Sequence, residues 1–271
     1  MMRKNIFRRF VKIVRSTLIA LVLAMSVGCG FRSVVVPNLD WLIGMRINKV
    51  LELEGKEKKQ LYKDISVILE KSKPTVARIQ DKLKTADLKK IDFEREQVFF
   101  RSEYEAMVEI VLPYYSRYLS RMSPEQIERL RKSNKEADEK ILEEIKQANQ
   151  KNLEFFESFL GTLTTEQKKI IKTSSKNFVN SRVERLKRRK RYRKQLDEIF
   201  LKTDTKTRES EIMEISRKYV KASRTSEFAK LFIATCRSVI EISNSQQQSK
   251  FREKLNEYSK WLESLIATKY N

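Results

Sequence analysis

Few side chains in this sequence have the type and spacing that catalysis or metal binding requires. The chain has no histidine and only two cysteines, so Cys/His zinc sites are excluded on count and the Glu-x-x-His pairs of di-metal bundles cannot occur. Adjacent carboxylates such as Glu94 with Glu96, or Glu143 with Glu144, lie in neither an apolar setting nor a Gly-rich turn. No nucleophile elbow, P-loop or dinucleotide fingerprint is present. We therefore expect a protein that is not an enzyme and uses no cofactor or metal.

Positive charge is the densest chemical signal. Nine basic residues and one acid fall between Arg182 and Lys194, and Lys190 and Arg193 occupy positions where the helical apolar stripe should continue. We expect this helix to project around Arg188–Arg193 or to line a basic groove; the alternative is a solvated helix face. The candidate residues for binding an anionic ligand are Arg182, Arg185, Lys187, Arg188, Arg189, Lys190, Arg191, Arg193 and Lys194.

The N-terminus has the pattern of an export signal. Six basic residues and no acid precede an apolar run of about eleven residues that begins at Leu18, which is too short for a bilayer span of roughly 20 residues. A basic segment, a short apolar segment and small residues before a cleavage site are typical of a signal peptide. Removing residues 1–28 lowers the formal charge from +22 to about +16.

The proposed cleavage site, Val27-Gly28-Cys29, resembles the lipobox of bacterial lipoproteins, although Ser26 stands where that family usually has Leu. The resemblance implies that Cys29 receives a diacylglyceryl group, becomes the new N-terminus and carries fatty acyl chains such as palmitate. Gly30 follows where Asp would favour inner-membrane retention, which implies the periplasmic face of the outer membrane. An ordinary cleaved signal with a free Cys29 and an uncleaved anchor remain open.

Composition predicts an all-α fold. Five Gly and four Pro in 271 residues, with 35% charged residues, suit long helices. We expect a bent antiparallel bundle of about six or seven long helices, one of them the projecting basic helix. The domain boundaries are a signal peptide at 1–28, a tether at 29–37 and a helical periplasmic domain at 38–271. Cys236 recurs at helical spacing with Ile233 and Ile240, so it is expected to be a buried small hydrophobe, and no intramolecular disulfide is expected.

Helix boundaries are indicated by caps and breakers. Asn38 is expected to cap a first helix that runs through Trp41, Leu42, Ile43 and Met45 to Leu51, and Gly55 separates it from the next. Pro74 should kink or break the second helix and Pro113 should bend the third. Gly161 is expected to end a helix that begins at Pro124.

Two helix starts share one pattern, Met122-Ser123-Pro124-Glu125-Gln126 and Leu163-Thr164-Thr165-Glu166-Gln167. Each has a Ser/Thr N-cap and a Gln three residues later, which is a capping box. A weaker copy, Ile242-Ser243-Asn244-Ser245-Gln246, opens the last helix.

Together with the lipobox and Asn38-Leu39-Asp40-Trp41-Leu42, these starts resemble a family of uncharacterised proteobacterial lipoproteins defined only as a domain of unknown function. That family implies a helical envelope lipoprotein and supplies no catalytic residue. Leu163-Thr164-x-x-Gln167 is also similar to the LTxxQ motif of periplasmic stress chaperones, which form basic helical cradles.

Three functions follow as hypotheses. The first is a membrane-anchored binding or structural module for anionic envelope components: lipopolysaccharide, anionic phospholipid or acidic protein clients. The second is a chaperone-like holdase that uses aromatics such as Phe99, Tyr114 and Tyr115. The third applies if the signal peptide is misread, since a basic helical protein in the cytoplasm could bind nucleic acid; for an exported protein no nucleic-acid partner is expected.

Overall fold

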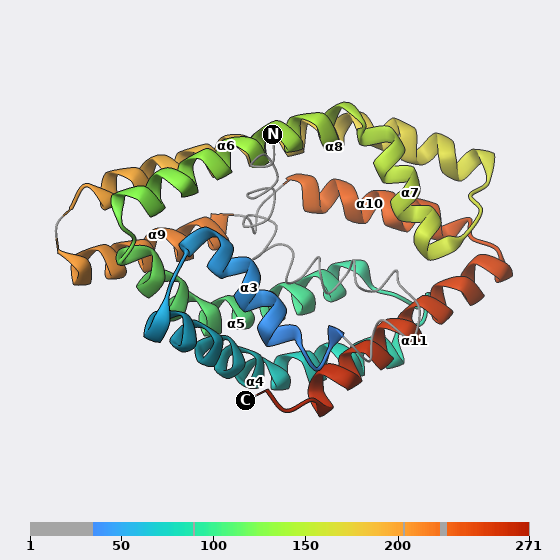
Figure 1. Cartoon of the computed structure of the whole chain (residues 1–271). Coiled ribbons are helices and arrows are strands. Elements are labelled where there is room, and N and C mark those ends of the chain that lie inside the picture. The colour runs from blue at the N-terminus through green and yellow to red at the C-terminus, as the bar shows by residue number, and fades with distance from the viewer. Residues whose placement is uncertain (1–34, 89, 203, 223–226, 271) are drawn as a thin grey trace, which may run out of the picture. The chain divides into compact units, whose positions relative to one another are not determined.

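The protein is described by a computed structural model of residues 35–88, 90–202, 204–222 and 227–270. Within these residues all regular secondary structure is helical, which confirms the predicted all-α class. Figure 1 labels the helices, which are α3 (Leu39–Leu51), α4 (Gly55–Thr85), α5 (Phe93–Ser120), α6 (Pro124–Lys146), α7 (Ala148–Leu160), α8 (Thr165–Phe200), α9 (Thr205–Ala222), α10 (Glu227–Glu241) and α11 (Ser245–Ala267).

The described part of the chain has nine helices rather than the six or seven expected, because one expected helix is divided and another is described as two segments. The stretch 124–160 divides into α6 and α7 at Gln147. The Gln147 N–H still bonds to the Glu143 carbonyl at 3.3 Å, and the Lys151 N–H to the Gln147 carbonyl at 3.0 Å. Hydrogen bonds thus continue on both sides of Gln147. The sequence around it contains no Gly or Pro that would have predicted the division. The expected Cys236 helix corresponds to α9 and α10, on either side of residues 223–226.

The chain forms two compact units, which we describe separately. Among the described residues, unit 1 comprises 35–81, 106–139 and 257–270, and unit 2 comprises 82–105 and 140–256. Helices α4, α5, α6 and α11 contribute residues to both units. The boundaries predicted at 28 and 37 lie outside these units or at their edge, and they stay predictions.

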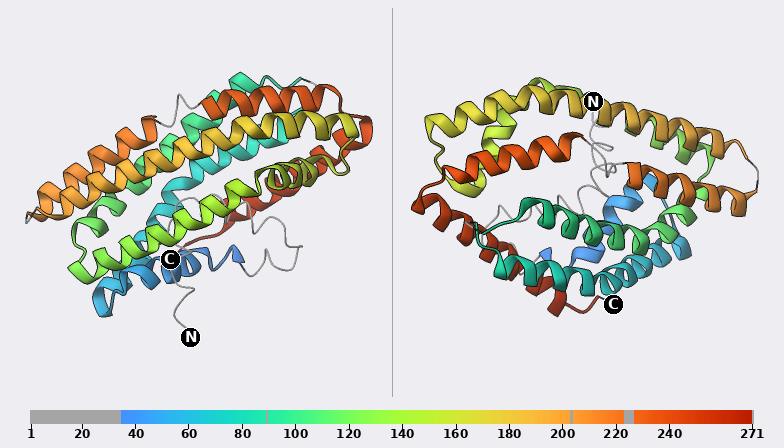
Figure 2. Two further views of the ribbon diagram at one scale, coloured as in Figure 1. Left: turned by 90° about the horizontal axis from the view of Figure 1, so that it is seen from above. Right: turned by 180° about the vertical axis from the view of Figure 1, so that it is seen from behind.

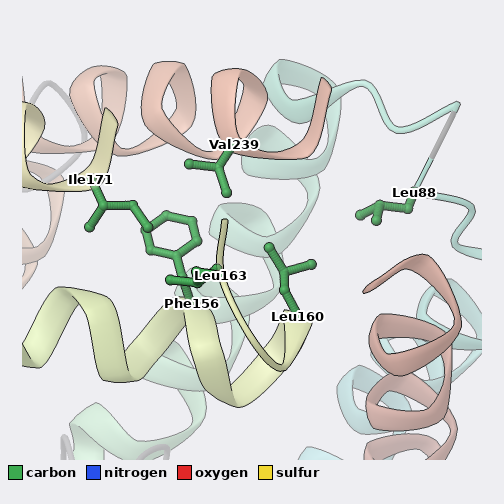
Figure 3. Packing of buried hydrophobic residues seen from close by; sticks show 6 residues of the cluster. All are labelled: Leu88, Phe156, Leu160, Leu163, Ile171 and Val239. Atoms are coloured by element: carbon green, nitrogen blue, oxygen red, sulfur yellow. The ribbon is translucent and has the colours of Figure 1, made fainter. Parts of the chain in front are cut away.

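The core of unit 2 is built on α8. Helices α7, α9 and α10 pack against it, and α9 and α10 lie along it in both views of Figure 2. Figure 3 shows the buried cluster at one end of α8, which consists of Leu88, Phe156, Leu160, Leu163, Ile171 and Val239. Cys236 packs against this cluster, and burial raises the pKa of its thiol to about 12.

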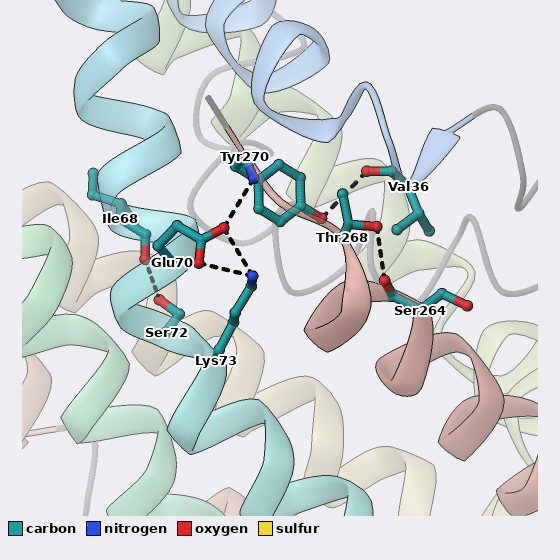
Figure 4. A network of polar contacts seen from close by, with 8 residues as sticks. All are labelled: Val36, Ile68, Glu70, Ser72, Lys73, Ser264, Thr268 and Tyr270. Atoms are coloured by element: carbon teal, nitrogen blue, oxygen red, sulfur yellow. Dashed lines mark hydrogen bonds and ion pairs between the residues drawn. The ribbon is translucent and has the colours of Figure 1, made fainter.

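Unit 1 joins the two ends of the described chain. The Tyr270 backbone N–H donates to the Glu70 carboxylate at 2.9 Å, and the Tyr270 hydroxyl donates to the Val36 carbonyl at 3.2 Å (Figure 4). Lys73 pairs with Glu70 at 2.8 Å, and the hydrogen bonds from Lys73 and Tyr270 lower the pKa of Glu70. Tyr270 thus links Val36, near the first described residue, to Glu70 on α4.

A buried carboxylate connects α4 with α5 in unit 1. Asp64 receives hydrogen bonds from the Tyr118 hydroxyl at 2.7 Å and the Gln60 amide at 2.8 Å, and it forms an ion pair with Arg117. Burial and the bond to Asp64 raise the pKa of Tyr118. A buried charge tolerates desolvation only when it is paired and hydrogen-bonded in this way, so the cluster is a packing feature of the α4–α5 contact.

Two predicted capping boxes are confirmed. The Ser123 hydroxyl accepts from the Gln126 N–H at 3.2 Å, and the Gln126 side-chain carbonyl accepts from the Ser123 N–H at 2.8 Å. Thr164 and Gln167 repeat these bonds at 3.2 and 3.0 Å. Gly161 ends α7 with φ +74°, a conformation that favours glycine, as predicted.

The third box lies one residue later than predicted. Asn244, not Ser243, accepts from the N–H of Gln247 at 2.9 Å, and the Gln247 side chain accepts from Asn244 at 3.3 Å. Gln247 and Gln167 also form reciprocal amide hydrogen bonds of 2.8 and 3.0 Å. We call these two glutamines the amide pair. Since neighbouring Ser, Asn and Gln residues allow both registers, the local pattern could not choose between them.

Three other local predictions need correction or qualification. Asn38 makes no capping hydrogen bond, because its φ of −109° and ψ of 19° are not the extended backbone that a capping side chain needs. Pro74 and Pro113 lie inside continuous helices, so the break considered at Pro74 does not occur, while a kink at Pro74 and a bend at Pro113 stay predictions. Near each proline, Ser72 and Ser116 donate to the carbonyl four residues earlier, at 2.7 and 3.0 Å.

Candidate anionic-ligand interface

The predicted basic segment lies in the C-terminal half of α8, in unit 2. Leu186, Leu196, Ile199 and Phe200 are buried on one side of the helix, so α8 is packed along this length. Arg189, at 8% exposure, is covered as well. The prediction that this helix projects is therefore not confirmed. The observed burial is that of a packed helix with basic residues along its exposed side.

The nine candidate residues separate onto two faces of α8. Four are exposed and lie within an arc of about 100° at 3.6 residues per turn: Lys187, Lys190, Arg191 and Lys194. We call them the outer stripe. Four are buried or partly buried on the opposite side: Arg182, Arg185, Arg189 and Arg193. We call them the inner stripe. Arg188 lies between the two faces and is half-buried.

The inner stripe belongs to the packing of unit 2. Arg182 donates to the Asn152 side-chain carbonyl at 2.8 Å and to the Glu144 backbone carbonyl at 3.4 Å. Burial lowers the pKa of Arg182, and the charge of Glu144 opposes that shift. The expectation that Lys190 stands in the apolar stripe is wrong, because Lys190 is exposed. The basic residues that replace apolar ones on the packed face are arginines, whose planar head groups suit partly buried hydrogen bonding.

Three tyrosines lie near the inner stripe: Tyr104, Tyr192 and Tyr219. The hydroxyls of Tyr192 and Ser216 are 2.7 Å apart, and the ring centroids of Tyr192 and Tyr219 are 5.0 Å apart. Burial raises the pKa of Tyr104, and the charge of Arg185 opposes this shift. The hydrogen bond and the ring contact join α8 to α9 inside unit 2. With the hydrogen bonds of Arg182 and the burial of Arg189, they place the inner stripe on the packed side of α8 and leave the outer stripe as the exposed part of the predicted site.

The outer stripe carries little compensating negative charge. Glu184 is the only acid between Arg182 and Lys194, and it forms an exposed ion pair with Lys187 at 2.7 Å. The hydrogen bond from Lys187, with the charges of Lys187, Arg191 and Arg188, lowers the pKa of Glu184. The surface therefore keeps a net positive charge around Glu184, as an anionic ligand would require.

The closely spaced carboxylates Glu94 and Glu96 form ion pairs with basic residues. Glu94 pairs with Arg237, and Glu96 with Lys82 at 2.7 Å. Among the described residues no group of three or more His, Cys, Asp or Glu side chains could hold a metal ion. In the same part of the chain, no helix has the length and apolarity to cross a bilayer. Cys29, the predicted lipidation site, lies outside the described residues.

Trp41 and Met45 on α3 were not among the predicted site residues. The structure exposes them at 53% and 43%, which is high for large apolar side chains at successive turns of one helix. Plotting α3 at 100° per residue would have placed them opposite the packed face.

Comparison of the chain with protein-family models, curated proteins and solved structures finds no match.

Proposed function

We propose that this protein is a lipid-anchored periplasmic protein on the inner surface of the outer membrane, which binds anionic envelope components without enzymatic activity. Cys29 is the proposed attachment point. The proposed ligands are lipopolysaccharide phosphates, anionic phospholipid headgroups or acidic segments of client proteins. Three finer points remain predictions: membership of a lipoprotein family, the antiparallel arrangement of the bundle and a projecting basic helix. Small-angle scattering of the mature chain tests the arrangement of the helices.

The observation that supports this proposal is the outer stripe. Four basic side chains occupy one exposed face over a rise of about 10 Å. Each Lys or Arg near an anionic surface contributes about 1 kcal/mol at moderate ionic strength. Packing of the inner stripe holds α8 in place, so these charges are presented together rather than on a free chain.

A charge-matched pair of variants tests the ligand. The first replaces Lys187, Lys190, Arg191 and Lys194 with Gln. The control replaces Lys56, Lys58, Lys59 and Lys63, which are exposed on α4, so both variants lose four charges. We expect the outer-stripe variant to bind phosphatidylglycerol vesicles at least tenfold more weakly, from roughly 1 kcal/mol per charge, and the control to bind nearly as well as wild type. Equal losses would mean that only net charge matters.

The proposed address needs a separate test. Wild type and Cys29→Ser should be compared by intact mass and membrane fractionation. We expect a cleaved, acylated wild type in the outer membrane and an unacylated variant that leaves it. An uncleaved cytoplasmic chain would overturn the envelope proposal and favour nucleic acid as the anionic partner.

A holdase is the second candidate, favoured by apolar exposure on α5. The suggested aromatics Phe99, Tyr114 and Tyr115 are only partly exposed, whereas Phe100 and Tyr104 are exposed at 38% and 36%, four residues apart. If this face binds unfolded clients, replacing Phe100 with Ser should reduce the suppression of aggregation of a reduced client protein, and the outer-stripe variant should not.

A further inference from the structure

Helix α3 has two distinct faces. Its buried residues, Leu39, Gly44, Val50 and Leu51, pack into unit 1. On the other side, within an arc of about 140°, lie Trp41, Leu42, Met45, Arg46 and Lys49. We call these five residues the α3 outer face. It combines large exposed apolar side chains with two basic residues, and it contains no acid.

The packed face is fastened closely to unit 1. A Cβ at Gly44 would lie 2.4 Å from Cε1 of Tyr62, so the α3 backbone lies directly against that ring. The Ser66 hydroxyl donates to the Asp40 carboxylate at 3.2 Å, and the Gln126 amide donates to the Leu51 carbonyl. Both ends of α3 are thereby fixed, and its outer face is a constant feature of unit 1.

We propose that the α3 outer face lies on an anionic phospholipid membrane. Trp41 and Met45 enter the boundary between headgroups and acyl chains, where indole rings are favoured and amphipathic helices bury their apolar side. Arg46, which is exposed, and Lys49, which is half-buried, face the lipid phosphates. This contact uses residues of unit 1, whereas the outer stripe belongs to α8 in unit 2.

The length of the preceding chain argues for the membrane rather than another occupant. The inference rests on the proposed function for the position of the lipid, at Cys29. Five residues lie between Cys29 and Val35, and the six Cα–Cα steps span at most about 20 Å when fully extended. Val36 is itself tied to the C-terminal residues by Tyr270 (Figure 4). The start of α3 therefore stays close to the bilayer that holds the anchor.

Tryptophan fluorescence tests the contact directly. The chain has two tryptophans, and Trp261 is buried, so Trp261→Phe leaves Trp41 as the only reporter. The mature protein is reconstituted into phosphatidylethanolamine/phosphatidylglycerol vesicles, with and without bromine on the acyl chains. We expect bromolipid to quench Trp41 and the bilayer to protect it from acrylamide. The control reporter is Leu142→Trp in a Trp41→Phe, Trp261→Phe background, since Leu142 has a similar exposure of 45%, and it should stay open to acrylamide.

A second pair of variants measures the energetics. Met45→Asp and Leu142→Asp each place a carboxylate on an exposed apolar position, in the mature chain (29–271) that carries Cys29→Ser and therefore has no lipid anchor. We expect Met45→Asp to weaken vesicle binding about tenfold, because it removes apolar burial and turns a negative charge towards anionic lipid. Leu142→Asp should have little effect, and circular dichroism checks that both variants fold.

The outcomes separate this inference from the proposed function. An acylated, membrane-bound protein whose Trp41 stays accessible to acrylamide overturns the α3 contact and leaves the anchor intact. A chain that is not acylated but whose Trp41 is quenched by bromolipid supports the α3 contact and removes the lipoprotein address. Equal quenching of Trp41 and of the Leu142→Trp reporter also overturns the proposal, since the contact would not be specific to α3.

Discussion

The replacement of Gln167 by Ala should be among the most destabilising substitutions in unit 2. Gln167 is fully buried, at 0% exposure. Its side-chain carbonyl accepts from the Thr164 N–H at 3.0 Å and from the Gln247 amide at 2.8 Å. Its amide donates to the Val239 carbonyl at 3.1 Å and to the Gln247 side-chain carbonyl at 3.0 Å. All four hydrogen-bonding positions of this amide are therefore used inside the protein.

The expected loss follows from what the substitution leaves behind. It leaves the Thr164 N–H and the Val239 carbonyl without a partner, and it breaks both hydrogen bonds of the amide pair, although Gln247 keeps its bonds to Asn244 and Thr162. The Val239 carbonyl belongs to the last turn of α10, where carbonyls lack a helical partner. A buried unsatisfied polar group costs about 1–3 kcal/mol, and a lost hydrogen bond about 1 kcal/mol. Taking about 1 kcal/mol for each of the two groups and for each of the two lost bonds gives about 4 kcal/mol, before any cost of the cavity.

Gln126 provides the matched comparison. It occupies the same capping-box position, but it is only partly buried and its partners are Ser123 and the Leu51 carbonyl. Gln126→Ala leaves two groups without a partner but breaks no glutamine–glutamine pair, so it should cost about 2 kcal/mol. Urea unfolding followed by circular dichroism gives both free energies. A cost for Gln167→Ala no larger than that for Gln126→Ala would refute the reasoning.

A double-mutant cycle tests the amide pair itself. Because either single substitution already breaks both reciprocal bonds, the double variant loses them only once. The two costs should therefore fall short of additivity by about 1–2 kcal/mol, within the range for contacting residues. Additive costs would show that the reciprocal bonds contribute nothing to stability.

Three further predictions concern packed positions, with Lys194→Ala as the exposed comparison for the first. Arg182→Ala should lower the free energy of unfolding by about 1–2 kcal/mol, since a half-buried hydrogen-bonded head group is lost, whereas Lys194→Ala should stay within about 0.5 kcal/mol; urea unfolding measures both. Burial raises the pKa of Cys236 to about 12, so the folded state keeps this proton longer than the unfolded state. Stability should fall as pH rises from 9 towards 12, by more in wild type than in Cys236→Ala, and a native thiol that reacts with iodoacetamide at pH 8 as fast as the urea-unfolded one would contradict this. Gly44→Ala should cost about 1–3 kcal/mol through overpacking against Tyr62, and thermal unfolding that matches wild type would show that α3 can shift freely.

Local chemistry was the most predictable part of the fold. Capping boxes at Ser123 and Thr164, and the glycine at the end of α7, depend on backbone groups within four residues of one another. Composition was equally direct, because few Gly and Pro with many charged residues leave little except helix. The division of the helix at Gln147 was not predicted. Backbone hydrogen bonds continue on both sides of this residue, and no helix-breaking residue is present there.

The candidate site was predictable as a segment but not as a surface. Counting charges locates Arg182–Lys194, yet only packing decides which side of α8 is covered. Helical periodicity should have suggested the division, since residues 187, 190, 191 and 194 share one face. The basic residues were instead treated as a single patch that includes Arg182 and Arg189, which the structure places in packed positions.

The capping-box glutamines show how a local signal can also carry tertiary information. Either Glu or Gln can close a capping box, because both offer an oxygen to the N-cap N–H. Only Gln adds an N–H₂ group, and at residues 126, 167 and 247 this group donates to a backbone carbonyl outside its own helix: Leu51, Val239 and Thr162. A helix start that needs only a local cap has no reason to prefer Gln. The repeated choice of Gln therefore marks the places where the N-terminus of one helix meets backbone carbonyls from another part of the chain.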